Sequence, residues 1–329
     1  MRILLTGAAG GIGSTLGYYL HKKGHQLTLI DNLRNGYSEN LLIGKKTFGD
    51  FYNQDIRDPQ LVDKLIDLYD CIIHLAAITA LPDCESGVSD TIHTNVAGTV
   101  NIMECARKWN VPHVIFASTS AVYENNNETI FTEDLEINPR LWYSLSKKMA
   151  EEVCESYRIN YGMNITTLRF FNVFGQRQDI HRKNPPLLNY LVREIKQGKQ
   201  PVLHSTGEQA RDYIHVDDVV KLIDLCLEKK PDDTFNVCTG RLLSVNQIVK
   251  YVCETFDGSI TPIYREASKL WDTYPDLFSG YYPLDKEIVA KETNKYSKGS
   301  YQKAKELLGW EPNTDLEDLI KKVATEINL

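Results

Sequence analysis

Short, uniformly apolar segments alternate with amphipathic stretches through the first half of this chain. Strands are expected at residues 2–6, 26–30, 71–75 and 113–117, and helices at 12–22, 60–68 and 95–109. Strands that alternate with helices build parallel βαβ units. Parallel strands covered on both faces read as continuous apolar runs, as these do. The sequence therefore predicts an α/β fold with a doubly wound parallel sheet.

The second half continues this pattern and then becomes irregular. A long helix is expected at 143–160, a buried strand at 165–170 and a polar loop at 176–186. Further helices are expected at 187–197 and 217–227, with a short strand at 234–237. Residues 265–298 are rich in Tyr, Pro, Lys and Gly, so we expect this segment to cover a site.

The composition argues against several classes of protein. The 329 residues carry a formal net charge of −7, whereas nucleic-acid binders present cationic surfaces to phosphate. The seven cysteines are scattered without a C-x-x-C, which argues against a zinc site and for a reducing compartment. No stretch approaches the roughly 18 apolar residues of a membrane span. The apolar run that opens the chain is too short for a secretion signal. We expect a cytoplasmic protein that binds neither metal, membrane nor nucleic acid.

A glycine-rich turn follows the first predicted strand. Gly7, Gly10 and Gly13 give G-x-x-G-x-x-G at the start of a predicted helix. The first glycine permits a tight turn, the second leaves room for a pyrophosphate, and the third lets helix and strand pack closely. The helix N-terminus offers free N–H groups and a partial positive charge to phosphate. Because turns also use glycine, the motif alone is weak evidence for a dinucleotide site.

Asp31 ends the second predicted strand, at the distance where an acidic residue meets the ribose hydroxyls of a dinucleotide. A carboxylate there repels a 2′-phosphate, which favours NAD over NADP. Arg34 weakens this preference, since a nearby guanidinium suits the extra phosphate. The alternative is that Asp31 only begins a turn.

Tyr143 and Lys147 form Y-x-x-x-K at the start of a predicted helix. Positions i and i+4 share a helix face, so the ammonium is expected beside the phenol. A free tyrosine has a pKa of about 10, and a neighbouring cation favours the phenolate. The hydroxyl of Thr119, at the carboxyl end of the strand 113–117, is expected to align a substrate oxygen with Tyr143. An exposed helix face and hydroxyls that only satisfy loop backbone are the alternatives.

These features occur in one order along nearly the whole chain. The order is the glycine turn, Asp31-Asn32-Leu33, Asp55-Ile56, His74-Leu75-Ala76-Ala77, Asn95-Val96-Ala97-Gly98-Thr99, Ser118-Thr119-Ser120, Tyr143-x-x-x-Lys147, Arg169-Phe170-Phe171-Asn172, Arg211-Asp212-Tyr213 and Leu308-Gly309-Trp310. The ordered set resembles the extended short-chain dehydrogenase/reductase family, specifically its NAD-dependent nucleotide-sugar epimerase/dehydratase branch, which includes UDP-hexose 4-epimerases.

The resemblance implies a division of the chain into two domains. A Rossmann domain is expected over residues 1–170, with a returning segment near 213–240. A smaller, mixed α/β substrate-binding domain is expected over 171–212 and 241–329. The helices at 91–109 and 143–160 resemble the pair that forms a dimer interface in this family, which implies a homodimer.

The resemblance also implies roles for individual residues. Thr119, Tyr143 and Lys147 would be catalytic. NAD would contact Gly7, Gly10, Gly11, Ile12, Gly13, Asp31, Asn32, Asn35, Asp55, Ile56, Leu75, Ala76, Ala77, Asn95, Tyr143, Lys147 and Phe171. A nucleotide-diphosphate sugar would contact Thr79, Thr119, Ser120, Asn172, Arg211 and Ser297. Tyr143 would take the proton of a sugar hydroxyl while hydride passes to the nicotinamide, and Lys147 would bind the ribose and lower the pKa of Tyr143.

Departures from the family pattern disfavour two of the reactions that members of the family catalyse. Dehydratases carry an Asp-Glu pair directly after the threonine, and decarboxylases usually have Glu at the second of these positions. This chain has Ser120 and Ala121, so both reactions are disfavoured. Ser297, placed at the gate of the sugar pocket, would admit an N-acetylated hexose. Ala290 falls where relatives have a second phosphate-binding Arg, which leaves Lys291 as the substitute cation.

The leading hypothesis is thus an NAD-dependent epimerase of a nucleotide-activated hexose, with C4 as the expected carbon. The alternative is a net NAD(P)-dependent oxidoreductase of a nucleotide-activated sugar. An inactive cofactor-binding scaffold is disfavoured because Thr119, Tyr143 and Lys147 are all present.

Overall fold

The computed structural model describes residues 1–61, 68–256, 258 and 260–327 of the chain. Most of the helix expected at 60–68 lies outside these residues. No helix of the described part is long and apolar enough to cross a membrane.

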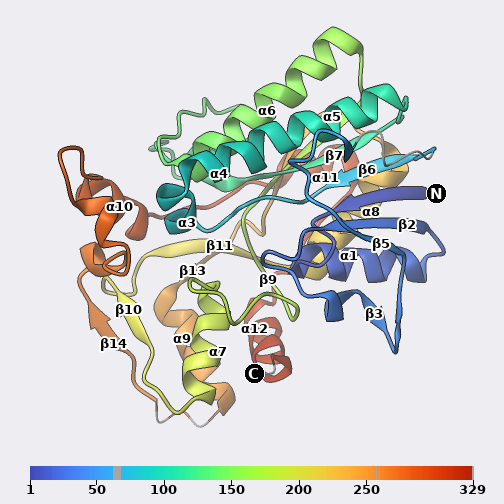
Figure 1. The fold of residues 1–329 in the computed structure, drawn as a ribbon. Helices are drawn as coiled ribbons and strands as arrows, with labels where there is room; N and C mark the ends of the chain where they lie inside the picture. The colour runs from blue at the N-terminus through green and yellow to red at the C-terminus, as the bar shows by residue number, and fades with distance from the viewer. Residues whose placement is uncertain (62–67, 257, 259, 328–329) are drawn as a thin grey trace.

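A seven-stranded sheet forms the centre of one half of the molecule (Figure 1). All six strand pairings are parallel. In spatial order the strands are β12 (Thr234–Val237), β8 (Ile165–Phe170), β7 (Val114–Thr119), β6 (Cys71–His74), β1 (Arg2–Thr6), β2 (Gln26–Asp31) and β5 (Asp50–Asn53). The chain winds outward in both directions from β1, so the order reverses between β1 and β6. Ligands of doubly wound sheets bind at such a reversal, beyond the carboxyl ends of the strands.

Helices cover both faces of this sheet. One face packs against α1 (Gly11–Lys22), α8 (Val216–Lys229) and α11 (Gln302–Leu308), and the other against α5 (Gly98–Lys108) and α6 (Trp142–Tyr161). Successive residues of β1 serve opposite layers, because Leu5 joins the first core cluster and Leu4 the second. This double coverage confirms the predicted fold class and explains the continuous apolar runs.

The approach to α5 is more elaborate than expected. The chain passes through α3 (Leu81–Ser86), α4 (Val88–Ile92) and a π-helical turn, η2 (His93–Ala97), before α5 begins. The π turn lies against α6. Such turns are often found at functional sites.

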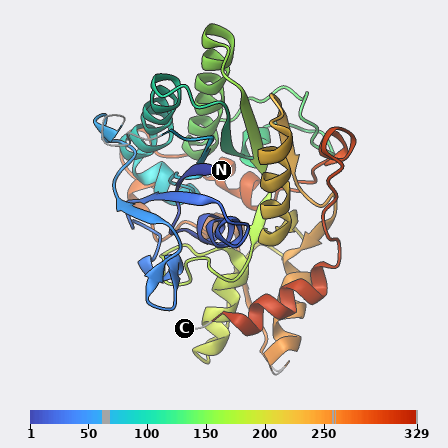
Figure 2. The same ribbon diagram turned by 90° about the vertical axis from the view of Figure 1, so that its right-hand side faces the viewer.

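The remaining elements form a second region below the sheet in Figure 1. It contains a mixed sheet of β13 (Leu242–Ser244), β11 (Ala210–His215) and β9 (Asn172–Phe174), and a parallel pair of β10 (Val202–His204) and β14 (Ile263–Arg265). Its core is formed by α7 (Leu187–Lys196), α9 (Val245–Phe256) and α12 (Leu316–Glu326). Figure 2 shows α12 and α6 at opposite ends of the molecule. The exact domain division proposed from the sequence stays a prediction.

Short elements complete the chain. They are the hairpin strands β3 (Leu42–Ile43) and β4 (Lys46–Thr47), the helix α10 (Lys286–Thr293), and the 3-10 turns η1 (Ser38–Leu41), η3 (Ser120–Tyr123), η4 (Ala267–Lys269) and η5 (Pro275–Phe278). The predicted loop at 176–186 is free of helix and strand, as expected.

Candidate active site

A cavity of about 1040 Å³ opens at the carboxyl ends of β1, β6 and β7 and reaches into the second region. Its lining includes all the predicted site residues except Asp55 and Asn95. Residues of the segment expected to cover a site also line it, among them Arg265, Trp271 and Lys295. One cavity thus brings the glycine turn, the Y-x-x-x-K helix and the β11 region together.

The glycine turn occupies the reversal point of the sheet. Gly7 has φ +69°, and a Cβ there would lie 2.7 Å from the backbone nitrogen of Ala76, which follows β6. A Cβ on Gly13 would lie 2.1 Å from the carbonyl oxygen of Gly7. Both positions therefore require glycine for packing. A Cβ on Gly10 would meet only the Gly7 oxygen, at an ordinary 3.4 Å, so packing does not explain this glycine.

The start of α1 is open to a ligand. Gly10 is its N-cap residue, and no side chain caps the helix. The first N–H groups of a helix have no partner within the helix and attract phosphate. Asp31 stands beside the turn, where its carboxylate accepts hydrogen bonds from the backbone nitrogens of Ala9 at 3.0 Å and Leu33 at 2.8 Å. Burial raises the pKa of Asp31. The turn, the open helix and this carboxylate fit a dinucleotide with free ribose hydroxyls.

Arg34 does not stand free to receive an additional phosphate. Its guanidinium pairs with Asp90, and Arg57 pairs with the same carboxylate. Because Asp90 neutralises part of their charge, Arg34 offers less to a 2′-phosphate than the sequence implies.

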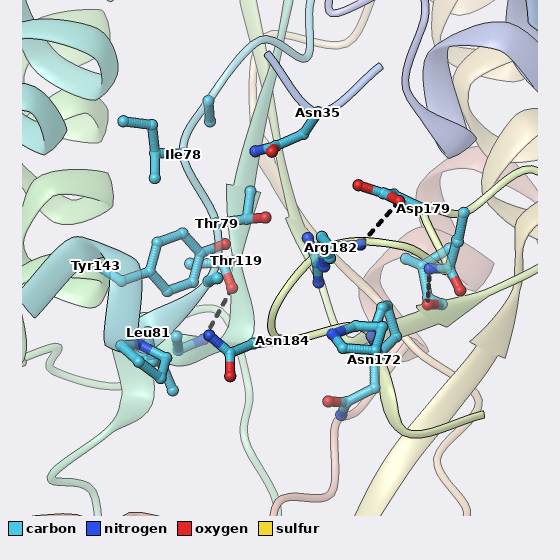
Figure 3. Close-up of a pocket in the computed structure, with 18 of the residues that line it drawn as sticks. Asn35, Ile78, Thr79, Leu81, Thr119, Tyr143, Asn172, Asp179, Arg182 and Asn184 are labelled. Carbon is cyan, nitrogen blue, oxygen red and sulfur yellow. Dashed lines mark hydrogen bonds between the residues drawn. The ribbon is translucent and has the colours of Figure 1, made fainter. Parts of the chain in front are cut away.

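Thr119 and Tyr143 meet inside the cavity (Figure 3). Thr119 ends β7, and its hydroxyl accepts a hydrogen bond from the Ala121 nitrogen at 3.2 Å. Tyr143 lies in the first turn of α6. Burial raises the pKa of Tyr143 to about 12, while a hydrogen bond with Thr119 and the charge of Arg182 oppose this rise. The predicted partners are therefore adjacent.

The cation that lowers the pKa of Tyr143 in this structure is Arg182, and burial outweighs its effect. The expected effect of Lys147 on this pKa stays a prediction. Lys147 is itself buried, with its Nζ 4.3 Å from the centre of the Phe116 ring. Burial lowers the pKa of Lys147 to about 8, and Glu151, one turn further along α6, opposes this.

Two glutamates missed by the sequence analysis hold the N-terminus of α6. The Glu124 carboxylate accepts hydrogen bonds from the Leu141 nitrogen at 3.0 Å and the Ser144 hydroxyl at 2.6 Å. Glu85 of α3 accepts one from the Trp142 nitrogen at 2.5 Å. Burial raises the pKa of Glu85 to about 7. Carboxylates suit the positive end of a helix, and these two fix the turn that carries the reactive tyrosine.

The model of the NAD dependent epimerase/dehydratase family matches residues 3–238 of the chain. The chain belongs to this family. A UDP-glucose 4-epimerase of Thermotoga maritima, crystallised with UDP-glucose, superimposes with a TM-score of 0.87 and is 31% identical over 99% of this chain and 98% of its own. A UDP-N-acetylglucosamine 4-epimerase of Methanobrevibacter ruminantium, crystallised with UDP-N-acetylmuramic acid, has a TM-score of 0.86 and is 25% identical, over 99% and 97%. A UDP-glucuronate 4-epimerase of Thermodesulfobacterium geofontis is 27% identical over 97% of this chain and 94% of its own.

Two residues predicted to contact NAD, Asn95 and Asp55, do not belong to the cavity lining. The amide of Asn95 exchanges hydrogen bonds with both backbone groups of Ile78, at 2.8 and 2.9 Å, and donates to the Ser146 hydroxyl at 3.0 Å. Asn95 thus ties the loop after β6 to α6. Asp55 accepts hydrogen bonds from Arg57 at 2.7 Å and Asn32 at 2.9 Å, and Arg57 holds the pKa of Asp55 down at about 2. Their contact with NAD stays a prediction.

Three of the residues predicted for the substrate, Asn172, Arg211 and Ser297, lie at β11. Asn172 donates to the Asp212 carbonyl at 2.9 Å, and the Arg211 guanidinium donates to the Glu292 carbonyl at 2.5 Å. Ser297 pairs with Arg211 as an extra β-bridge and is buried. Lys291, suggested as the substitute cation, does not line the cavity, nor does Ala290. The basic residues that line the cavity but were not predicted from the sequence are Arg182, Lys183, Arg193, Arg265, Lys269 and Lys295.

Proposed function

We propose that this protein is an NAD-dependent 4-epimerase of a UDP-activated hexose. One observation carries the proposal: Thr119, Tyr143 and Lys147 line the same cavity as the glycine turn of a dinucleotide-binding sheet. The full-length similarity to UDP-sugar 4-epimerases supports the choice of carbon and nucleotide.

The side chains suggest a division of labour. NAD, when bound, supplies the acceptor and donor of hydride in this cavity. Tyr143 would act as the phenolate, which the positive charge of Arg182 and of oxidised NAD favours. It takes the proton from the sugar hydroxyl to become the neutral phenol, and returns that proton to the same oxygen after the sugar has turned its other face. Thr119 aligns that oxygen with the phenol, because both side chains line the same cavity and face each other there (Figure 3). Lys147 binds the cofactor's ribose, where its buried position limits its motion.

The lining next to Thr119 favours epimerisation over elimination. Ser120 and Ala121 follow it in η3, and neither side chain transfers protons at neutral pH. The carboxylates that line the cavity within the described residues are those of Asp31, Asp179, Asp272 and Glu292, none of them beside Thr119 in the chain. The direct path to dehydration used by relatives is therefore missing.

Incubation of the purified protein with UDP-glucose and UDP-glucuronate, with and without added NAD, tests the function. An epimerase forms the C4 epimer without net absorbance change at 340 nm. A net oxidoreductase instead consumes NAD and accumulates NADH in proportion to product. The Tyr143→Phe variant should lose about 10²–10⁴-fold in turnover, the usual contribution of a positioned acid–base group, while its NAD affinity stays unchanged. Undiminished turnover would refute the mechanism.

We also propose that the protein is a cytoplasmic homodimer. The helices α5 and α6 lie side by side on one face of the sheet (Figure 1), joined by a 2.6 Å hydrogen bond from Tyr157 to Glu104. Large apolar side chains are exposed near the end of α6, with Ile159 71% and Tyr161 56% accessible. Seven buried free cysteines fit a reducing compartment. Sedimentation at low concentration tests the dimer, and a monomer there would contradict it.

A further inference from the structure

Arg182 carries a charge in the cavity that forms no ion pair with any of the residues that the structure describes. It belongs to the loop at 176–186 and lies between Tyr143 and Asp179 in Figure 3. Its backbone nitrogen donates to Asp179 at 3.1 Å. Its Nε atom is buried without a hydrogen-bond partner. The guanidinium forms no hydrogen bond or ion pair with any residue of the described part.

The two carboxylates that attract this guanidinium are occupied elsewhere. Asp179 accepts hydrogen bonds from the Tyr37 hydroxyl at 2.7 Å and the His181 nitrogen at 2.8 Å. Asp83 of α3 accepts one from the Tyr274 hydroxyl at 2.7 Å. These contacts hold both acids in place, so neither is free to turn toward Arg182.

Arg182 is half-buried, and its buried Nε–H is a donor without a partner among the described residues. An unsatisfied buried donor costs free energy. A ligand that brings an oxyanion would recover this cost, because the planar fork of arginine matches carboxylate and phosphate oxygens. The phosphates of NAD are expected to bind at the start of α1. Arg182 instead interacts electrostatically with Tyr143, so the oxyanion that it binds belongs to the substrate end of the cavity.

We propose that Arg182 binds an oxyanion of the substrate beside Tyr143, supplied either by the carboxylate of a nucleotide-activated hexuronate or by the phosphate adjoining the sugar. This inference rests on the proposed function, since it assigns the sugar end of the cavity to a nucleotide sugar. If the oxyanion is the carboxylate, Arg182 determines specificity as well as affinity, because a uronate gains a charge-assisted contact that a neutral hexose lacks.

Binding to the Tyr143→Phe protein tests this without turnover. Dissociation constants for UDP, UDP-glucose, UDP-glucuronate and NAD are measured by calorimetry, with and without Arg182→Gln. A loss of at least tenfold for UDP-glucuronate alone assigns the carboxylate. An equal loss for all three uridine nucleotides assigns the phosphate. Unchanged affinities, or a loss confined to NAD, would overturn the proposal.

Two further variants serve as controls for this interpretation. Arg182→Lys keeps the charge without the fork and should recover part of the lost affinity. His181→Gln alters the neighbouring residue, which is exposed and does not line the cavity, and should change no affinity. Because the guanidinium forms no hydrogen bond or ion pair with the described residues and its buried Nε is unsatisfied, Arg182→Gln without ligand should unfold at or above the temperature of its parent. Wild-type protein that binds UDP-sugars without epimerising them would refute the proposed function and leave the role of Arg182 measurable. Absence of UDP-sugar binding by the parent would refute both.

Discussion

Gly10 gives the most direct test of whether the glycine turn is built for a ligand. The backbone at Gly10 has φ −73° and ψ 171°, a conformation open to any residue. An added Cβ would meet only the Gly7 oxygen, at 3.4 Å. Alanine therefore fits the folded protein, and the reason for glycine must lie in what approaches the turn from the cavity. We expect Gly10→Ala to spare folding and impair cofactor binding.

The size of each effect follows from opposing contributions. Alanine is a poorer N-cap than glycine, but it lowers the entropy of the unfolded chain by about 0.4–1 kcal/mol. The free energy of unfolding without cofactor should thus change by less than about 1 kcal/mol. A pyrophosphate that contacts the turn would meet the new methyl group. We expect a loss of NAD affinity of about tenfold, which corresponds to about 1.4 kcal/mol. With NAD at 100 times the wild-type Kd, cofactor stabilisation would fall from about 2.7 to about 1.4 kcal/mol.

The assay compares urea unfolding of the cofactor-free protein with unfolding at fixed NAD, together with calorimetric NAD titrations. Gly24→Ala is the matched control. Gly24 has φ +85° with nothing within 4 Å of an added Cβ, so alanine should cost roughly 1–2 kcal/mol of backbone strain and leave NAD affinity unchanged. The reasoning is refuted if Gly10→Ala binds NAD as tightly as the wild type, or if it is severely destabilised without cofactor.

Three other predictions address the cofactor preference, the lysine and the catalytic helix. Asp31→Asn keeps the shape but removes the charge, so the ratio of NAD to NADP affinity should fall at least tenfold; an unchanged ratio would exclude Asp31 from cofactor choice. Since burial lowers the pKa of Lys147 to about 8, the ammonium is present below that pH, and kcat/KM should fall as pH rises through it. Lys147→Arg remains charged and should move the fall to higher pH, whereas identical profiles would contradict this assignment. Glu124→Gln weakens the charge-assisted hydrogen bonds to Leu141 and Ser144 and should lower stability by about 1–3 kcal/mol and kcat more than KM, measured by urea unfolding and steady-state kinetics.

The sequence predicted the strands and helices of the large sheet closely, because each of them has a continuous apolar run or a clear helical period. The strand predicted at 113–117 extends to Thr119, since Ser118 and Thr119 pair with Arg169 and Phe170 of β8. β5 was missed because its residues, Asp50–Asn53, are mostly polar and lie at the exposed edge of the sheet. Pairing with a neighbouring strand, which local sequence does not encode, decided both cases.

The residues of the candidate site also fall into two groups, those that a sequence motif located and those that no motif could locate. Residues of the glycine turn and of the Y-x-x-x-K helix have fixed spacings along single elements, so a motif located them. Arg182, Arg265 and Lys295 come from an irregular loop, an edge strand and the end of a covering segment. No helical or strand periodicity of the sequence relates these three positions. Lys291 was suggested as the substitute cation and Lys295 was not considered, because only the path of the chain after α10 decides which lysine reaches the cavity.

The buried polar contacts behind the cavity explain how an irregular lining can still orient a reactive phenol. Asn95 joins the loop after β6 to α6, and Glu85 and Glu124 hold the start of α6 from two separate elements. These contacts join the loop that carries Thr79 to the helix that carries Tyr143. Reacting groups must be held closely for efficient catalysis. Substitutions at these three positions should therefore change turnover although none of them lines the cavity, which makes the supporting network as much a part of the site as the residues a substrate touches.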